Sequence, residues 1–343
     1  MGEEMKKRRT TITDIARELN LSPSTVSRAL NNHPAISTKT RESVIELARK
    51  RNYQPNLLAL NLLKKRSNTI GVIVPEITSY FFSSVINGIQ DLLNPLGVNM
   101  IIGQSNESYE EEKSIVQTFT SARVDGFLVS PSSETDNFDH LRLLSESNIP
   151  LVVFDRDCEG LEVDKVFVDE YSGAFQAVEY LIEKGCRRIA HIAGAPTLST
   201  ARHRLRAYKA ALEKHHLPVI PGLIVQSSGF APEHGIEPTK KLLSLHSPPD
   251  AIFTINDGVA IGAMYVIKEA GIAIPDEISV VGFDDDPHSY YFKPSLTTVW
   301  QPTYDMGMLS ARILMKRIQT QNDSSSYRVE KLFPELIIRG SSR

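Results

Sequence analysis

The sequence has only two cysteines and no long apolar run. Cys158 and Cys186 match no metal-ligand or redox spacing, so we expect neither a disulfide framework nor a metal site. No apolar stretch approaches the roughly 18 residues that a membrane-spanning helix needs. The N-terminus is basic and then amphipathic, unlike a secretory signal peptide. We therefore expect a soluble, cytoplasmic protein that has no membrane partner.

Glycine-rich phosphate loops are also missing. Neither G-x-G-x-x-G nor G-x-x-x-x-G-K-[ST] follows an apolar run, which argues against nucleotide-dependent chemistry. The sequence shows no nucleophile-elbow serine and no metal-ligand cluster. We therefore expect no cofactor and no catalytic residue. A sugar-processing enzyme that uses paired acids remains an alternative, because two acids in a cleft are necessary for such chemistry but not sufficient.

Charge is distributed unevenly along the chain, although the net formal charge is only -3. Residues 1–66 hold 14 Lys and Arg against 6 Asp and Glu, which makes this segment +8. The remaining residues hold 24 against 35 and carry -11. A basic head on an acidic body predicts a polyanionic partner for the head alone.

The basic head carries the pattern of three short helices. Thr11 and Asp14 can form a capping box before the first helix, and Ser22 with Pro23 marks the start of the second. A third helix is expected from 37 to 51. The second helix would turn a short polar face outward, as insertion into a DNA major groove requires. That face comprises Ser24, Thr25, Ser27, Arg28 and Asn31. A plain three-helix bundle is the alternative interpretation.

The residues of this head closely resemble the headpiece of the lactose and galactose repressor (LacI/GalR) family. The matching runs are TDIA at 13–16, LSPSTVSRALN at 21–31, TR at 40–41 and YQPN at 53–56. The resemblance implies a helix-turn-helix headpiece at 1–54 that binds pseudo-palindromic operator DNA as a homodimer. It also implies DNA contacts by the second helix and by Thr11, Ser22, His33, Thr40, Tyr53, Asn56, Ala59 and Leu62.

The same resemblance implies a hinge helix at 55–66. Leu62 aligns with the family leucine that inserts into the central minor-groove step. Such an insertion unstacks the bases at that step and bends the duplex. Leu60 stands where most members carry arginine, so one DNA contact of the family is not expected here. Because no leucine heptad follows the strand-like residues 336–338, we expect a dimer rather than a dimer of dimers.

From Ile70 onward, short apolar runs alternate with helical patterns such as those at 81–93 and 173–184. Continuous Val, Ile and Leu runs predict strands of parallel sheets that are covered on both faces. The sequence therefore predicts an α/β fold with doubly wound parallel sheets, whose ligands bind beyond the carboxyl ends of the strands. The expected strands are 70–74, 100–103, 126–129, 151–154, 166–168, 189–192, 251–254 and 279–283.

Polar and aromatic residues follow several of these strands. Carboxylates, amides and guanidinium groups bind hydroxyls, and aromatic rings cover apolar C–H faces, so this set is suited to a polyol. It comprises Ser79, Phe81, Phe82, Ser130, Asp155, Arg156, Asp169, Asn256, Asp257 and 284–286, with Arg204 and Gln301 in loop-like segments. The alternatives are structural: caps or turns for Asp257, Asp285 and Asp286, core for Phe81 and Phe82, surface charge for Arg204 and a buried structural role for His191.

The chain from Ile70 to its end is similar to the effector domain of the same family and to periplasmic ribose-binding protein. The similarity implies two lobes of periplasmic-binding-protein-like type I, at 67–168 plus 302–329 and at 169–301 plus 330–343. Ser79 and Ser130 stand where the ribose binder has asparagines, which leaves a pentose open but argues against ribose itself. Implied effector contacts are Ser79, Phe81, Phe82, Ser130, Asp155, Arg156, Arg204, Phe230, Asn256, Asp284 and Gln301, with Asp169 near the hinge.

Together these features predict a transcriptional regulator, expected to be a repressor, whose operator affinity is controlled allosterically by a monosaccharide such as a pentose. A purine effector is one alternative. Purine-binding members of the family stack the base on a tryptophan where this chain has Arg156, and an Asp-Arg pair favours hydroxyl recognition. Control by a phosphorylated partner protein, as in the catabolite-control branch, is another alternative.

Overall fold

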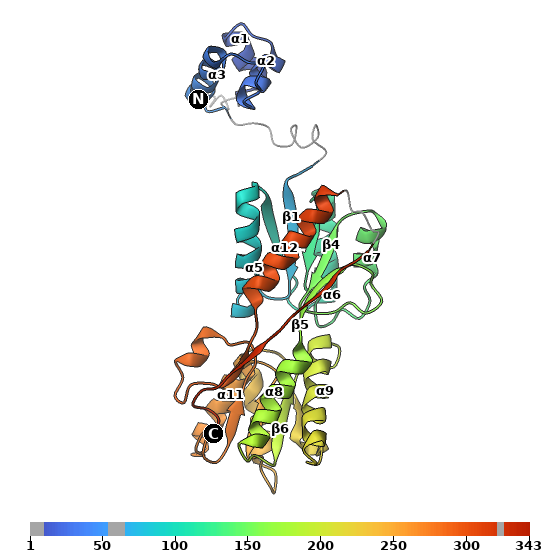
Figure 1. Ribbon diagram of the computed structural model, residues 1–343, viewed down its shortest axis with the longest axis vertical. Helices are drawn as coiled ribbons and strands as arrows, with labels where there is room; N and C mark the ends of the chain where they lie inside the picture. Colours follow the sequence, from blue (N-terminus) through green and yellow to red (C-terminus); the bar gives the residue numbers. More distant parts are fainter. Residues whose placement is uncertain (1–9, 54–65, 321–325) are drawn as a thin grey trace, which may run out of the picture. The chain divides into compact units, whose positions relative to one another are not determined.

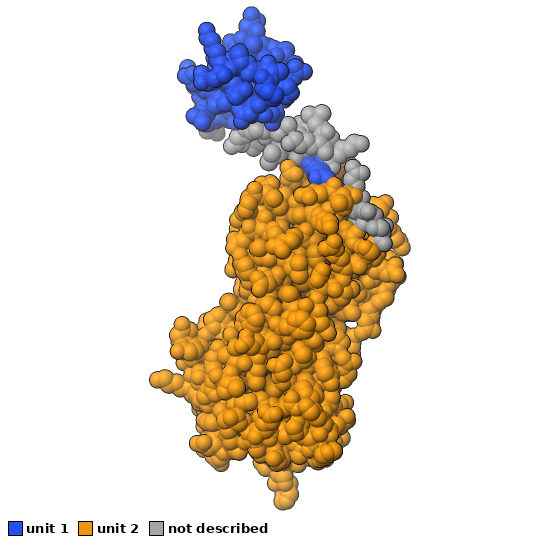
Figure 2. All heavy atoms as spheres, viewed as in Figure 1, with its two compact units in different colours: residues 1–67 blue, residues 68–343 orange. Residues whose placement is uncertain are grey.

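The computed structural model describes residues 10–53, 66–320 and 326–343. The chain divides into two compact units, Met1–Ser67 and Asn68–Arg343 (Figure 2). Asn56, Ala59 and Leu62 of the expected hinge helix lie outside the described residues.

The first unit contains the three expected helices, α1 (Ile12–Glu18), α2 (Pro23–Leu30) and α3 (Thr38–Lys50) (Figure 1). The capping box is confirmed, because the Asp14 N–H donates to Thr11 Oγ1 at 3.3 Å and the Thr11 N–H donates to Asp14 Oδ2 at 2.9 Å. Ser22 caps α2 through the Thr25 N–H at 3.1 Å. The helices enclose a small core of Ile15, Ala16, Val26, Ala29, Val44 and Ala48.

The second unit consists of two lobes, each built on a parallel sheet. The first sheet has the order β11-β5-β4-β3-β1-β2 and the second the order β7-β6-β8-β9. The first contains β1 (Thr69–Val74), β2 (Asn99–Gln104), β3 (Phe127–Val129), β4 (Leu151–Phe154), β5 (Asp164–Val168) and β11 (Val329–Leu332). The second contains β6 (Ile189–Ala193), β7 (Ile224–Gln226), β8 (Ala251–Thr254) and β9 (Ser279–Val281). The expected doubly wound α/β fold is confirmed.

Helices cover both faces of each sheet (Figure 1). Residues of β1 alternate between the two cores of the first lobe, since Val72 and Val74 pack with α5 and α12 whereas Ile73 packs with α6 and α7. The helices of the first lobe are α5 (Tyr80–Leu93), α6 (Tyr109–Ser121), α7 (Asp139–Glu146) and α12 (Thr303–Gln319). Those of the second lobe are α8 (Glu170–Glu183), α9 (Ser199–Lys214), α10 (Glu233–Leu243) and α11 (Asp257–Glu269).

The chain passes between the lobes after β5, before α12, and again between β11 and β12 (Glu335–Ile337). In Figure 1 the last passage is the long red segment that runs from one lobe to the other. β12 pairs with β10 (Thr298–Trp300), whereas β11 pairs with β5 in the first sheet. That sheet therefore extends to Leu332, beyond the lobe boundary expected at 329. β11 reads Val-Glu-Lys-Leu, which lacks the continuous apolar run that marks the inner strands.

Close packing of α5 against α12 fixes the position of the α5 N-terminus, which faces the other lobe. A Cβ at Gly88 would lie 2.1 Å from the Tyr304 carbonyl oxygen, and one at Gly307 would lie 2.1 Å from that of Val85. Only glycine permits this approach of the two backbones.

No helix in the described residues is both long and apolar enough to cross a membrane. Within the same residues no cluster of His, Cys, Asp or Glu is placed to hold a metal.

Candidate functional site

The polar face expected on the second helix lies on α2. Val26 and Ala29 are fully buried, and the polar side chains Ser24, Thr25, Ser27 and Arg28 are fully or partly exposed. Ser22 Oγ lies 2.8 Å from both Ser24 Oγ and Thr25 Oγ1. The helix therefore begins with a group of hydroxyls beside backbone N–H groups, an arrangement suited to phosphates and base edges.

The other residues expected at the DNA have structural contacts of their own. Thr11 Oγ1 lies 2.7 Å from Asp14 Oδ2, and Thr40 Oγ1 lies 2.9 Å from Ser37 Oγ, so both hydroxyls take part in helix caps. Tyr53 packs against the three-helix core, and burial raises the pKa of its phenol. The remaining two are exposed: the Asn31 amide donates to Ser27 O at 2.9 Å, and His33 Nδ1 accepts from the Ala35 N–H at 3.2 Å.

In the second unit, residues from both lobes line one pocket, which we call the inner pocket. Its lining includes Ser79, Phe81, Phe82, Asp155, Arg156, Arg204, Phe230, Asn256, Asp284 and Gln301, all expected from the sequence. Ser130 lies behind it and donates to Asp155 Oδ2 at 3.1 Å. Glu76, Glu107 and Thr200 also line it and were not expected. The free volume is about 70 Å³, well below the roughly 300 Å³ at which ordinary ligand pockets begin.

The Arg156 guanidinium is fully engaged inside this pocket. Nη1 donates to Glu107 Oε2 at 2.6 Å and to Pro131 O at 2.9 Å, and Nη2 donates to Glu107 Oε1 at 2.7 Å. The rings of Phe82 and Phe230 lie 6.0 and 5.7 Å from the guanidinium carbon. A bidentate ion pair framed by aromatic rings holds this side chain in one orientation.

Arg204 is buried rather than a surface charge, which corrects that alternative. Its Nε donates to Glu170 Oε2 at 2.6 Å, and the two side chains are only 6% and 4% exposed. Nη1 donates to Ile255 O, and the Phe283 ring centroid lies 3.7 Å from the guanidinium carbon. Arg204 therefore lines the inner pocket from the second lobe in a fixed position, with Glu170 neutralising its charge.

Two carboxylates of the pocket have unusual backbone geometry. Asp155 has φ 66° and Asp284 has φ 121°, values that non-glycine residues adopt at a cost and that are concentrated at functional sites. Burial raises the pKa of Asp155 to about 6 despite the opposing charge of Arg156, and burial also raises the pKa of Asp284 well above its usual value. Asp284 accepts from Gln301 Nε2 at 2.7 Å, and the buried Gln301 Oε1 has no hydrogen-bond partner among the residues that the structure describes. It is therefore available to a ligand hydroxyl.

Comparisons with known proteins identify the family to which this chain belongs. Residues 11–56 match the family model for bacterial regulatory proteins of the lacI family, and residues 178–342 match a periplasmic-binding-protein-like domain. The probable HTH-type transcriptional repressor ExuR of Bacillus subtilis is 36% identical over 342 residues, covering 97% of this chain and 98% of that protein. This chain belongs to the LacI family. The family resemblance expected from the sequence is thus confirmed.

Other LacI-family proteins extend the comparison. The ribose operon repressor of Halalkalibacterium halodurans is 33% identical, with 97% of each protein covered. The crystal structure of the lac repressor dimer bound to operator and the anti-inducer ONPF matches with a TM-score of 0.88 at 27% identity, covering 97% of this chain and 99% of that one. The curated relatives are transcriptional repressors, and this LacI-family chain shares their organisation along its length.

Asn256 and Asp257 both make structural hydrogen bonds near the pocket, and a structural role was the alternative interpretation of Asp257. Asn256 caps α11 by accepting from the Val259 N–H at 3.0 Å, while its Nδ2 donates to Phe230 O at 3.0 Å and positions that loop. Buried Asp257 accepts from the Asp286 N–H at 2.8 Å and from Ser289 Oγ at 2.7 Å. These two residues therefore organise the second lobe.

Four further residues have structural contacts. Asp286 caps a short 3-10 helix, and Asp285 pairs with Arg339 at 2.6 Å. Asp169 caps α8 where the chain enters the second lobe and lies 3.2 Å from Lys331 Nζ. His191 stacks on Phe253 at 4.9 Å, and burial lowers the pKa of its imidazole to about 4, as a structural histidine would show.

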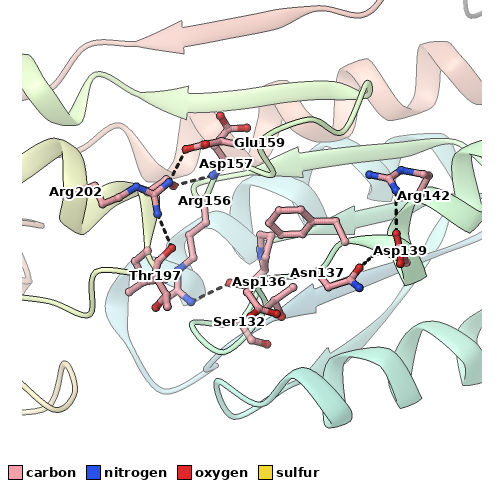
Figure 3. A pocket seen from close by; sticks show the side chains of 15 residues that line it. Ser132, Asp136, Asn137, Asp139, Arg142, Arg156, Asp157, Glu159, Thr197 and Arg202 are labelled. Atoms are coloured by element: carbon pink, nitrogen blue, oxygen red, sulfur yellow. Dashed lines mark hydrogen bonds and ion pairs between the residues drawn. The ribbon is translucent and has the colours of Figure 1, made fainter.

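A larger cavity of about 600 Å³ lies beyond Arg156, which lines both spaces (Figure 3). We call it the outer cavity. Arg202 of the second lobe reaches Glu159 of the first at 2.5 Å, and the Asp157 N–H donates to Ser199 Oγ across the same gap at 2.9 Å. These contacts hold the two lobes together at the edge of the cleft.

Proposed function

We propose that this chain is a dimeric repressor that reads operator DNA with α2 and responds to a sugar in the inner pocket. The observation that carries the proposal is the convergence of both lobes on one small polar space. A ligand that contacts both lobes stabilises one arrangement of them over others. Such coupling is typically worth about 1–3 kcal/mol, and it would reach the operator through the link between the two units.

The chemistry of the pocket favours a polyol over a flat base. Asp155, Arg204 and Gln301 Oε1 offer both donors and acceptors to hydroxyl groups. The rings of Phe81 and Phe82 are 5.0 Å apart and nearly perpendicular, at 82°, so they cover the edges of a small ring rather than form a stack. The guanidinium of Arg156 lies between Phe82 and Phe230, where a purine would otherwise stack.

A dimer fits an apolar surface on the second lobe. Large aromatic side chains are exposed on α11 and the loop after β9, a set that we call the aromatic patch: Tyr265 at 57%, Tyr290 at 64%, Tyr291 at 78% and Phe292 at 39%. Exposed apolar groups gathered in this way mark interaction sites. We propose a second copy of the chain as the occupant, because the related lac repressor is a dimer on its operator.

Replacing Arg28 by alanine is expected to lower affinity for the preferred operator by about 5- to 150-fold, the loss of one base contact worth about 1–3 kcal/mol. The preferred duplex would be selected from a random library and affinities measured by fluorescence anisotropy at fixed salt. Arg49→Ala is the control: Arg49 is exposed in the last turn of α3, and we expect it to contact phosphate, so its loss should weaken binding to preferred and random duplexes alike. Failure of the library to enrich any inverted repeat, with or without sugars, contradicts the proposal.

Effector affinity is expected to fall as the pH drops below about 6, by up to about tenfold for each unit. The ionised Asp155 carboxylate accepts hydrogen bonds from hydroxyl groups. Burial raises its pKa to about 6; Arg156, Arg204 and Ser130 oppose this rise, and Glu170 adds to it. Protonation removes that acceptor. Calorimetric titration between pH 5 and 8 measures the dependence, and Asp155→Asn should flatten it. If effector affinity of the variant depends equally steeply on pH, a group other than Asp155 causes the dependence.

A further inference from the structure

The Glu107 carboxylate occupies a site in the inner pocket that would also suit the carboxylate of a ligand. Glu107 places its two oxygens 2.6 and 2.7 Å from the two terminal nitrogens of Arg156. Glu107 Oε2 also accepts from the Ser133 N–H at 2.7 Å. A guanidinium fork together with a backbone N–H forms a complete binding site for one carboxylate.

The two partners differ in how firmly they are held. The Arg156 side chain is 7% exposed, and that of Glu107 is 30% exposed. Arg156 is also tied to Pro131 O at 2.9 Å. Glu107 belongs to the connection between β2 and α6, where Asn106 and Glu107 have φ 51° and 61°. Because its side chain is the more exposed of the two, Glu107 can turn toward water, whereas Arg156 stays buried.

A ligand needs space that the pocket does not offer while Glu107 is in place. The free volume of about 70 Å³ is too small for a sugar ring, and Glu107 lines that volume together with Arg156. Turning the Glu107 side chain outward enlarges the space without separating the lobes. This movement leaves the contacts between Arg202 and Glu159 and between Asp157 and Ser199 intact.

When Glu107 turns outward, Arg156 loses its carboxylate partner, and this loss indicates which charge the ligand carries. If a neutral sugar displaced Glu107, a buried cation would lose its bidentate carboxylate and, among the described residues, keep Asp155 as its ion-pair partner, with Asp155 Oδ2 3.5 Å from Arg156 Nε. Leaving a buried charge without its partner is strongly unfavourable. Exchange of one carboxylate for another keeps the charge balance of the pocket unchanged.

We propose that the effector is an acidic sugar, whose carboxylate replaces that of Glu107 on Arg156 and on the Ser133 N–H. Its hydroxyls then contact Asp155, Arg204 and Gln301. Glu107 is a built-in competitor that occupies the anion site until the effector arrives. This inference rests on the proposed function, because it names the ligand class of the same pocket.

Chemical rescue tests the anion site directly in the full chain. Glu107→Ala should lower the melting temperature, and sodium formate at about 100 mM should restore about 3 °C or more relative to sodium chloride at equal concentration. Glu170→Ala is the matched control. It also removes the carboxylate partner of an arginine, but at a position where both side chains are almost fully buried, so formate should not restore it. Equal responses of the two variants to formate overturn the proposal.

Matched sugar pairs test the ligand class. By calorimetry, the wild-type chain should bind D-galacturonate or D-glucuronate at least about tenfold more tightly than D-galactose or D-glucose, respectively. Arg156→Gln should reduce that preference to less than about threefold. A neutral sugar that binds at least as tightly as its acid and alters operator affinity overturns the acidic effector but supports the proposed function. If no sugar binds or alters operator affinity, both proposals fail.

Discussion

Replacing Arg204 by methionine is expected to lower the free energy of unfolding of the two-lobed unit by about 3–5 kcal/mol. The substitution leaves the Glu170 carboxylate, which is 4% exposed, without the cation 2.6 Å away. It also removes the donor to Ile255 O and the guanidinium stacked 3.7 Å from the Phe283 centroid. Urea unfolding followed by circular dichroism measures the change in midpoint.

Two further variants separate charge burial from loss of side-chain volume. The double variant Arg204→Met, Glu170→Met should recover most of the stability, because an apolar pair of similar size replaces a buried ion pair at little cost. Arg202→Met breaks a pair in which the side chains are 42% and 72% exposed, so it should change stability by less than about 1 kcal/mol. If Arg204→Met lowers the free energy of unfolding by no more than Arg202→Met does, the buried pair of Arg204 and Glu170 does not stabilise the fold.

The double variant Tyr265→Asp, Phe292→Asp is expected to convert the dimer to a monomer at about micromolar concentration. Both residues line an apolar groove together with Pro232, Ile236, Ile261 and Met264. Carboxylates placed in an apolar interface lose hydration without gaining partners. Operator affinity should then fall by about 100-fold or more, because a monomer engages a single half-site and loses the gain from bivalent binding.

Sedimentation velocity measures the association, and anisotropy measures operator binding. Leu143→Asp is the matched control. Leu143 lies on α7 of the first lobe, is 60% exposed, and belongs to neither the aromatic patch nor the groove, so its variant should stay dimeric. A double variant that remains dimeric places the interface on another surface of the chain.

The headpiece could be predicted almost completely because its signals are local. Thr11 with Asp14, and Ser22 with Thr25, are three positions apart, and each pair forms the hydrogen bonds expected of a helix cap. The inner strands were equally predictable, because strands buried on both faces read as continuous apolar runs. The short edge strands β7 and β11 were not predicted. β11 alternates exposed with half-buried residues along its length.

Most residues that line the inner pocket were predicted, but Glu76, Glu107 and Thr200 were not, and neither were the ion pairs. Arg156 and Glu107 are 49 positions apart, and Arg204 and Glu170 are 34 apart, so no local pattern joins either pair. Arg204 also stands between Arg202 and Arg206, a run that on its own indicates surface charge. Only one face of α9 is turned inward, and the fold places Arg204 on it.

The sequence alone determined the class of this protein: a basic helix-turn-helix unit followed by two parallel-sheet lobes with polar and aromatic residues at the strand ends. Those features depend on residues a few positions apart and on apolar periodicity, which act before any tertiary contact forms. The tertiary structure decided which guanidinium groups are buried and which carboxylates neutralise them. That choice depends on removing charges from water, and only packing between elements distant in the sequence does so.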